Sequence, residues 1–339
     1  MNPIPISEGR IPVMVAGLDG ISGVSAWSFR LREALKDHPR YRIVLVNCRE
    51  TGNKVGHFDA TAPSQSALRE LLRDLAPAIV VPNFIWPVFD VCASLIAEGV
   101  PLRCVGFCRA DSDVEYYNPL AWYEPLIARF AAVSPECGAR LASRMEHRQN
   151  DIAVMPTGVS VPPVPDRPYP CAPLRLVYGG RIVQQQKRVL DFVPLVEALL
   201  ARRCDFVFDI AGQGRQLGEL KSAMARIDHG GRVRFLGKVA PAGMDGIWRD
   251  HDVFIQCSDF EGTSNSMLES MAQGTIPVVT QTESGLAGII EHGVNGFLVP
   301  VGDMEAMAEI LGTLSADTAR LEALGRAAHA ATIPYAIDA

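Results

Sequence analysis

The chain has 339 residues, of which 48% are hydrophobic, and a formal net charge of −6 at pH 7. This length is long for one hydrophobic core and suits two domains of ordinary size. The excess of acidic over basic side chains disfavours a nucleic-acid partner that is held by bulk electrostatics.

Cysteine usage and the N-terminus bear on the expected compartment. The eight cysteines are scattered without a C-x2-C pair, and the histidines form no cluster. Residues 1–11 lack the pattern of a signal peptide, so we expect reduced thiols in a cytoplasmic protein, and no structural metal site. The most apolar stretch, 78–97, is interrupted by Pro82, Asn83 and Pro87, which favours a strand, a turn and a buried helix over a membrane span.

Short apolar runs alternate with segments of helical periodicity along the whole chain. Strands are expected at 12–17, 42–47, 78–82, 102–107, 130–133 and 152–155, and again at 174–179, 205–211, 232–236, 252–256, 275–279 and 296–299. Helices of the first half are expected at about 24–37, 64–75, 88–98, 118–129 and 135–147. This alternation predicts an α/β architecture of parallel sheets that are covered by helices on both faces.

A proline-rich segment separates the two halves. Residues 156–173 hold seven prolines, which neither a helix nor a central strand tolerates. We therefore place a domain boundary near residue 165, between domains 1–165 and 166–339. Two doubly wound domains facing each other would enclose a central cleft, with ligands bound beyond the carboxyl ends of the strands.

The first strand-to-helix turn is rich in glycine. Gly17, Gly20 and Gly23 form a G-x2-G-x2-G pattern, which does not match the G-x-G-x-x-G fingerprint of dinucleotide-binding proteins. The next strand also lacks a clear acidic residue for a ribose at its end, because Glu50 comes too late. A dehydrogenase is therefore disfavoured. The turn either faces a ligand or needs glycine for backbone geometry alone.

Charged residues follow the strand expected at 102–107. Arg109 and Asp111 lie just past its carboxyl end, where side chains face the ligand in this architecture. Arg109 would contact a phosphate or an acidic acceptor, or else form a structural salt bridge with Asp111 or Asp113.

A basic stripe is expected on the helix at 135–147. Arg140, Arg144 and Arg148 recur there every four residues. They form either a solvated face or a weak peripheral contact with anionic lipid head groups.

The second half opens with a cationic turn. The strand at 174–179 leads into Gly180 and Arg181, and Lys187 stands at the expected start of a helix. Arg and Lys over one crevice suit a pyrophosphate clamp, the alternative being two surface charges. Pro194 is expected to kink this helix, because its ring blocks a hydrogen bond to the Leu190 carbonyl.

The segment 259–279 carries two glutamates, Glu261 in a loop and Glu269 inside the helix that follows. A helical wheel divides this helix into a polar arc of Asn265, Ser266, Glu269 and Ser270 and an apolar arc of Met267, Leu268, Met271 and Ala272. The apolar arc should pack on a sheet, and Gly274 should end the helix. The free N–H groups at its start suit an anionic ligand, the plain alternative being an amphipathic helix with a solvated glutamate.

Four elements follow one another between residues 174 and 300: the G-G-R…K turn of residues 179–187, the glycine turn 212–214, the F-x-G turn 235–237 and the E-x7-E motif of Glu261 and Glu269. In order and spacing they resemble the C-terminal half of family 4 of the retaining glycosyltransferases, and the resemblance is looser before residue 160. It implies a GT-B-like fold and a metal-independent retaining hexosyltransferase. The donor substrate would be a nucleotide-diphospho-sugar, and no cofactor is expected.

The resemblance also implies roles for individual residues. The N-terminal domain would take the acceptor and the C-terminal domain the donor. Arg181 and Lys187 would hold the pyrophosphate, Glu261 the sugar hydroxyls and Glu269 the ribose hydroxyls. Further donor contacts would come from Gly20, Gly23, Lys238, Val239, Gly262, Thr263, Ser264, Asn265 and Ser266. The expected catalytic set is Arg181, Lys187, Glu261, Arg109 and Asp111. We expect a GDP- or UDP-sugar as donor, and a saccharide or lipid-linked acceptor.

This chain departs from the family pattern at Arg109, where members of the family carry a His shortly before an Asp. The family's last helix, which returns to the N-terminal domain, is expected to have little room here. Two alternatives stay open. One is a sugar-nucleotide 2-epimerase on the same scaffold, and the other is a catalytically silent protein that binds a nucleotide or a sugar.

Overall fold

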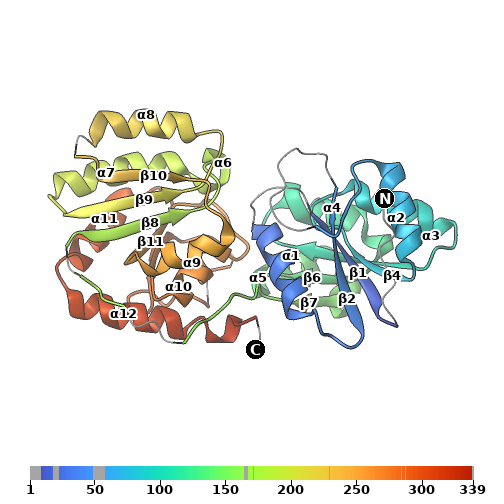
Figure 1. Ribbon diagram of the computed structural model, residues 1–339. Helices are drawn as coiled ribbons and strands as arrows, with labels where there is room; N and C mark the ends of the chain where they lie inside the picture. The colour runs from blue at the N-terminus through green and yellow to red at the C-terminus, as the bar shows by residue number, and fades with distance from the viewer. Residues whose placement is uncertain are drawn as a thin grey trace. The chain divides into compact units, whose positions relative to one another are not determined.

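A computed structural model describes residues 9–17, 23–48, 58–163, 167–170, 172–228, 230–283, 285–286 and 288–337. By its internal contacts the chain divides into an N-terminal unit, Met1–Gly158, and a C-terminal unit, Val159–Ala339 (Figure 1). The boundary expected near residue 165 lies outside the described residues. Each unit is an α/β domain built on a parallel sheet.

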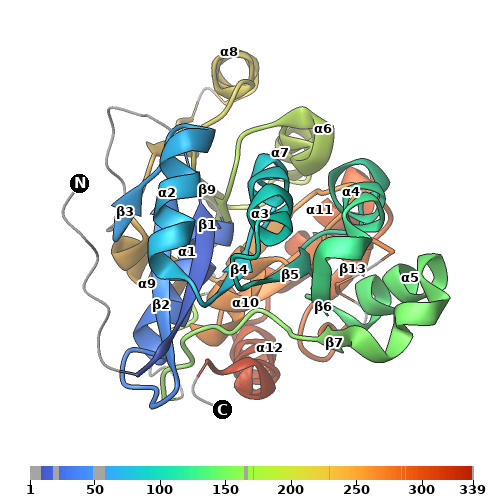
Figure 2. The ribbon, with the colours of Figure 1, turned by 90° about the vertical axis from the view of Figure 1, so that its right-hand side faces the viewer.

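The described strands of the N-terminal unit form one sheet in the order β3-β2-β1-β4-β5-β6-β7. They are β1 (Ile11–Gly17), β2 (Tyr41–Asn47), β3 (Ala60–Thr61), β4 (Ala78–Val81), β5 (Leu102–Cys108), β6 (Ile127–Ala132) and β7 (Ile152–Val154). The helices are α1 (Gly23–Ala34), α2 (Gln65–Leu75), α3 (Pro87–Ala97), α4 (Asn118–Trp122) and α5 (Pro135–Arg144). Helices α2 and α3 lie side by side (Figures 1 and 2).

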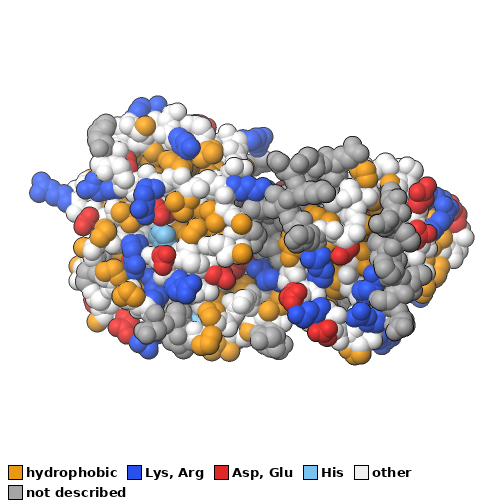
Figure 3. Space-filling model, in the orientation of Figure 1, with side chains coloured by type: hydrophobic (Ala, Val, Ile, Leu, Met, Phe, Trp, Pro, Cys, Tyr) orange, Lys and Arg blue, Asp and Glu red, His pale blue; other side chains and the backbone are white. Residues whose placement is uncertain are grey.

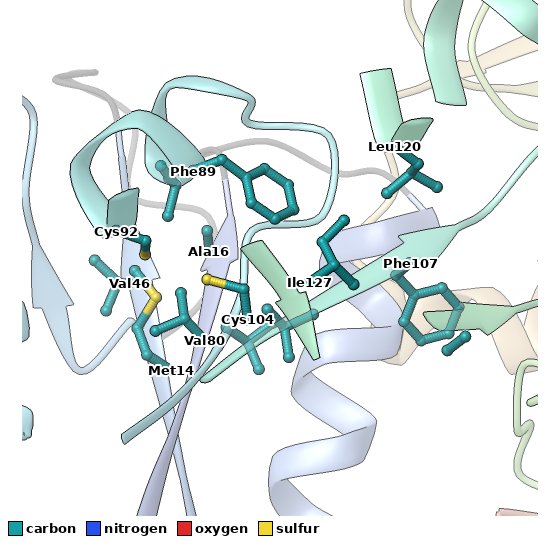
Figure 4. Close-up of a cluster of buried hydrophobic side chains, with 14 of the residues drawn as sticks. Met14, Ala16, Val46, Val80, Phe89, Cys92, Cys104, Phe107, Leu120 and Ile127 are labelled. Carbon is teal, nitrogen blue, oxygen red and sulfur yellow. The ribbon is translucent and has the colours of Figure 1, made fainter. Parts of the chain in front are cut away.

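Apolar side chains from both faces of this sheet form the N-terminal core. In Figure 4, Met14 of β1, Val80 of β4 and Phe107 of β5 lie with Phe89 of α3 among the buried side chains. The unbroken apolar run 43–46 in β2 is buried on both faces. A parallel strand that is covered by helices on both sides requires such a run.

The described strands of the C-terminal unit form a second sheet in the order β10-β9-β8-β11-β12-β13. They are β8 (Leu174–Gly179), β9 (Phe206–Ala211), β10 (Val233–Gly237), β11 (Val253–Gln256), β12 (Ile276–Thr280) and β13 (Phe297–Val299). The helices are α6 (Gln184–Lys187), α7 (Phe192–Ala201), α8 (Leu217–Ile227), α9 (Pro241–Arg249), α10 (Asn265–Ala272), α11 (Met304–Leu314) and α12 (Thr318–Ala330).

Two core clusters show which helices cover which face of the C-terminal sheet. Helices α7, α8 and α11 share one cluster with Leu176 and Phe208. Helices α9 and α10 share the other with Val177 and Phe254 (Figure 1). Helix α12 contributes to both clusters, through Leu321 and Leu324 to the first and Ala328 to the second. Neighbouring residues of β8 thus belong to opposite clusters, as the alternation of side chains along a strand requires.

The predicted strands are present, but two expectations about helices are wrong. The helix expected at 118–129 stops at Trp122, since Pro125 follows and Ile127 already pairs with Cys104 in the sheet. The helix expected to start at Lys187 instead has its end there, because Arg188 takes a left-handed conformation with φ 47°. Helix α7 begins only at Phe192, so Pro194 lies in its first turn, where no N–H is needed and no kink follows.

The expected basic stripe is also different from the prediction. Helix α5 ends at Arg144, and Arg148 lies in the short 3-10 helix Glu146–Asp151. All three arginines face carboxylates: Arg140 pairs with Asp111, Arg144 with Asp113, and Arg148 with Glu124 and Asp151. The face drawn in Figure 3 likewise shows basic and acidic side chains intermixed on each unit. In the part of the chain that the structure describes, no helix is both long enough and apolar enough to cross a bilayer.

A buried ion cluster holds the start of the C-terminal sheet. The Asp252 side chain is fully buried and accepts hydrogen bonds from Arg167 (2.9 Å) and from Nε of Arg175 (2.9 Å). Removing one partner of a buried pair leaves an uncompensated charge and costs about 3–5 kcal/mol.

We therefore expect Asp252→Asn to destabilise the C-terminal unit by about 3–5 kcal/mol. Urea unfolding, followed by a probe in this unit, measures the change. The matched control is Asp245→Asn, at an exposed carboxylate on α9. Equal midpoints for the two variants would show that the cluster does not stabilise the sheet.

Candidate functional site

The order of the C-terminal strands picks out one place on the sheet. From β8 the chain adds β9 and β10 on one side, and then crosses back to place β11 on the other side of β8. The loops after β8 and β11 therefore lead away in opposite directions. Open α/β sheets bind their ligands at this switch point, beyond the carboxyl ends of the strands.

An ion pair joins these two loops. Nζ of Lys187, which follows β8, lies 2.5 Å from Oε1 of Glu261, which follows β11. Only 15% of the Lys187 side chain and 7% of the Glu261 side chain are exposed. The structure thus brings together two of the predicted site residues, and it places a cation and a carboxylate at the switch point.

Gln186 fixes the same two loops, and it was not among the site residues predicted from the sequence. Its backbone carbonyl accepts a hydrogen bond from the Asp259 N–H (2.9 Å), and its side-chain amide donates to the Phe260 carbonyl (3.2 Å). Its Oε1 also accepts a hydrogen bond from Arg181. The exposed Arg181 is therefore oriented by a residue that already bridges to the Glu261 loop. The run of three glutamines before Lys187 was the only signal in the sequence.

Tyr178 holds the backbone of Arg181 in place. Its hydroxyl donates a hydrogen bond to the Arg181 carbonyl (2.6 Å). Burial, and to a lesser degree the charge of Glu261, raises the pKa of Tyr178 well above its ordinary value. The phenol therefore stays protonated and serves as a donor that positions the turn.

The turn after β9 packs directly against the turn after β8. Gly212 has φ +148°, and a Cβ there would lie 1.9 Å from the Gly180 carbonyl oxygen. The N–H of Gly180 in turn donates to the Ala211 carbonyl (3.0 Å). A residue with a side chain at position 212 would therefore push the Gly180–Arg181 turn away from the sheet.

Helix α10 begins directly after the Glu261 loop. The Ser264 side chain caps it by accepting a hydrogen bond from the Met267 N–H, and donates one to Oε1 of Gln256 (2.6 Å). Ser264 is 4% exposed, so its hydroxyl is committed to positioning the helix. A ligand at this helix start would therefore meet backbone N–H groups rather than this side chain.

The two arcs of α10 follow the helical-wheel prediction, with one exception. Met267, Leu268, Met271 and Ala272 are fully buried, whereas Asn265, Ser266 and Glu269 are partly exposed. Ser270, predicted on the polar arc, is fully buried, because its hydroxyl can donate to the Met267 carbonyl (2.8 Å). The left-handed Gly274 ends the helix as expected.

The remaining C-terminal candidates lie along the same edge of the sheet. Gly262 is buried and Thr263 partly exposed, between Glu261 and the start of α10. The exposed Lys238 and the partly exposed Val239 follow β10, which is separated from β8 by β9. The structure therefore places these two residues away from the Lys187–Glu261 pair.

In the N-terminal unit the two charged candidates do not form the alternative salt bridge that we considered. Asp111 accepts hydrogen bonds from Arg140 (2.9 Å) and the Tyr117 hydroxyl (2.8 Å). Arg109 instead donates from Nε to Oδ1 of Asn83 (3.0 Å). Gly23 begins α1, and Gly20 lies outside the described residues.

Among the described residues, no three His, Cys, Asp or Glu side chains gather in a way that could hold a metal ion. The groups at the C-terminal switch point are two cations, a carboxylate and a helix start. Such groups fit a ligand that carries both phosphate oxygens and hydroxyl groups.

Part of the chain is similar in sequence to known glycosyltransferases. Residues 173–317 match the sequence model of the family described as glycosyl transferases group 1. The chain is 34% identical over 149 residues to the amylovoran biosynthesis glycosyltransferase AmsK of Erwinia amylovora, which covers 42% of this chain and 36% of that protein. It is 29% identical over 202 residues to a phosphatidyl-myo-inositol mannosyltransferase of Mycobacterium leprae, which covers 57% of this chain and 51% of that protein. The chain thus spans between about a third and a half of the length of these curated relatives.

A solved structure extends the likeness to the whole chain. The Anabaena protein HepE, crystallised with UDP and glucose, superposes with a TM-score of 0.75 and 16% sequence identity. The match covers 97% of this chain and 96% of HepE. The fold is therefore GT-B, with two Rossmann-like domains, as the sequence predicts.

A close approach of backbone to backbone provides a test of how the Glu261 loop is held. Gly285 has φ +76°, and a Cβ there would lie 1.4 Å from the Gly262 carbonyl oxygen. Gly288 has φ +90°, and a Cβ added there would have no other atom within 4 Å. Both Ala variants strain the backbone, but only Gly285→Ala also displaces the loop.

We expect Gly285→Ala to lower stability by about 1–3 kcal/mol more than Gly288→Ala does. Denaturant unfolding of both variants measures the difference. Equal losses would mean that the Gly262 carbonyl moves freely and that Gly285 does not fix the loop.

Proposed function

We propose that this protein is a retaining, metal-independent glycosyltransferase of polysaccharide or glycan biosynthesis. It would move a hexose from a nucleotide-diphospho-sugar to a saccharide or lipid-linked acceptor. The observation that carries the proposal is the Lys187–Glu261 pair at the switch point of the C-terminal sheet. The group 1 match over residues 173–317 supports it.

The reaction breaks the bond between the anomeric carbon and a phosphate oxygen, so negative charge grows on the departing diphosphate. Lys187, Arg181 and the backbone N–H groups at the start of α10 provide positive potential for that charge. These groups are held in place by Gln186, Tyr178 and Ser264, and little reorganisation is needed when the charge develops.

Glu261 is proposed to bind the sugar of the donor. Its carboxylate can accept hydrogen bonds from the hydroxyls of the donor sugar. The Lys187 ammonium has three donors, so it can keep Glu261 as a partner while it contacts a phosphate oxygen. Glu269, partly exposed on α10, is proposed to bind the ribose hydroxyls, and the turn of Lys238 and Val239 the base.

We propose that the acceptor hydroxyl attacks the same face of the sugar from which the diphosphate leaves. The acceptor oxygen forms the new bond to the anomeric carbon, and the departing phosphate oxygen takes the acceptor's proton. This route yields retention without a covalent nucleophile. We assign no catalytic role to Asp111, since it is committed to Arg140 and Tyr117.

The relatives narrow the choice of ligands to test. HepE was crystallised with UDP and glucose, so UDP is our first candidate nucleotide and GDP the second. The names of the two relatives mention amylovoran biosynthesis and phosphatidyl-myo-inositol, so we test both a saccharide and a lipid-linked acceptor. We leave a membrane contact through Arg140, Arg144 and Arg148 out of the proposal, because their carboxylate partners offset the charge.

We expect one nucleoside diphosphate among UDP, GDP and ADP to stabilise the protein. A ligand at 100 times its dissociation constant adds about 2.7 kcal/mol, which is visible as a rise in melting temperature. No shift with any of the three, together with a shift by NAD(H), would reject a transferase.

Steady-state kinetics of a Lys187 variant tests the role of this residue. Lys187→Ala would leave the Glu261 carboxylate unpaired and nearly buried, so loss of activity could follow from loss of stability. We therefore choose Lys187→Gln and expect a ~30- to 1000-fold loss in kcat/KM, which corresponds to about 2–4 kcal/mol. Lys221→Gln, at an exposed lysine on α8, is the control. A Lys187→Gln enzyme with the turnover of the control would remove Lys187 from the mechanism.

We further expect transfer in the presence of EDTA and an unchanged anomeric configuration in the product. The physical reason is that Lys187, Arg181 and the α10 N–H groups can stabilise the leaving group without an ion. Proton NMR of the product reports the anomer. An inverted product, or activity that chelation abolishes, would contradict the proposal. An incubation without acceptor that yields an epimer of the donor would favour a 2-epimerase instead.

A further inference from the structure

Arg109 lies near the switch point of the N-terminal sheet. From β1 the chain adds β2 and β3 on one side, and then places β4 on the other side of β1. Asn83, in the loop after β4, donates from its side-chain amide to the carbonyl of Ala16 in β1 (2.6 Å). Its Oδ1 accepts the hydrogen bond from Nε of Arg109, which follows β5. The amide of Asn83 therefore ties Arg109 to the two strands between which the sheet changes direction.

The surroundings of Arg109 fix its guanidinium without neutralising it. Its Cζ lies 3.8 Å from the centre of the Trp27 ring and 3.8 Å from that of the Phe107 ring. Asn83 itself is 1% exposed and takes a left-handed conformation with φ 55°, which Asn adopts more readily than most residues with a side chain. Aromatic faces and a buried, hydrogen-bonded amide thus orient the group.

Among the described residues, no carboxylate forms an ion pair with the Arg109 guanidinium. The carboxylates nearest in sequence are engaged elsewhere, Asp111 with Arg140 and Asp113 with Arg144. Nη2 of Arg109 is buried and has no hydrogen-bond partner among the described residues. Burial lowers the pKa of Arg109 to about 9, so the group still carries its charge at pH 7. A buried donor without a partner costs free energy, which a ligand with acceptor oxygens would recover.

We propose that Arg109 is an anion-binding residue, which recognises a phosphate or carboxylate group on a ligand of the N-terminal unit. Guanidinium suits both groups, because its planar fork donates two parallel hydrogen bonds to paired oxygens. That this ligand is the sugar acceptor rests on the proposed transferase function. In that case the acceptor carries a negative charge, and Arg109 selects it over a neutral analogue.

The test is a titration of the full chain with inorganic phosphate, and separately with glucuronate, against sodium chloride at equal ionic strength. Arginine Nε–H and tryptophan indole N–H signals are followed by NMR, with the Arg109 signal assigned by its loss in Arg109→Met. We expect saturable shifts of the Arg109 and Trp27 signals with at least one of the two anions. Whichever anion is effective distinguishes a phosphate ligand from a carboxylate ligand.

Variants separate charge from packing. We expect Arg109→Met to bind the effective anion at least about tenfold more weakly, since a charge-assisted hydrogen bond is lost. Arg109→Lys keeps the charge and should recover part of this binding. Arg103→Met, at an exposed arginine of β5, the strand that Arg109 follows, is the matched control and should bind as the wild type does. Absence of shifts in the wild type, or equal binding by Arg109→Met and wild type, would overturn the proposal.

The outcome is independent of the proposed function. The nucleoside diphosphate shift tests the C-terminal unit, and Arg109→Met should retain it. A protein that binds phosphate at Arg109 but no nucleoside diphosphate would keep the anion site and lose the transferase. The reverse result would keep the transferase and remove the anion site.

Discussion

The ion pair between Lys187 and Glu261 is the contact on which the arrangement of the C-terminal site depends. It joins two loops that come from opposite sides of the point where the sheet reverses its order. Both side chains are largely withdrawn from water, so each needs the other as a counter-charge. Gln186 and Arg188 add further hydrogen bonds to the same loop, through Phe260 and Asp259. A site built in this way keeps its cation and its carboxylate in place before any ligand arrives.

Each sheet has a switch point with a cation nearby, but the two cations are held differently. Lys187 has a carboxylate partner, so a ligand that binds there must share the ammonium with Glu261. Arg109 has aromatic rings and the Asn83 amide around it, and one buried nitrogen that has no partner within the described part of the chain. The C-terminal site therefore suits a ligand with hydroxyls beside its phosphates. The Arg109 guanidinium in the N-terminal unit suits an anion that serves as its counter-ion.

Periodicity and turn chemistry were sufficient to predict the strands, the parallel sheets and the buried face of α10. Met267, Leu268 and Met271 are buried because an apolar arc at helical spacing packs against the sheet and the neighbouring helices α9 and α12. Local pattern failed where a distant contact decides the conformation. Arg188 adopts a left-handed conformation while it pairs with Asp259 and Asp191, which breaks the helix expected from Lys187. Asp191 is a local partner, but Asp259 lies 71 residues away in the sequence, so the local pattern near Lys187 does not contain this second contact.

The same limit applies to the charged candidates. The sequence marks Lys187 and Glu261 as members of one site, but not that they pair with each other. It leaves Arg109 equally able to pair with Asp111 or to face a ligand. Arg140 on helix α5 decides between these two possibilities, because it forms an ion pair with Asp111. Ion pairs between distant segments depend on the fold, so the spacing of charged residues in the sequence does not reveal them.

The central claim is that Glu261 holds the sugar of the donor, while Lys187 holds its diphosphate. Calorimetric titration of Glu261→Gln with the effective nucleoside diphosphate, and then with its sugar derivative, tests the claim directly. The account predicts that the nucleoside diphosphate binds within about threefold of wild type, because Lys187 is retained. It predicts a loss of about tenfold or more for the sugar derivative, whose hydroxyls lose a charged acceptor. Equal changes for the two ligands would contradict the assignment of Glu261 to the sugar.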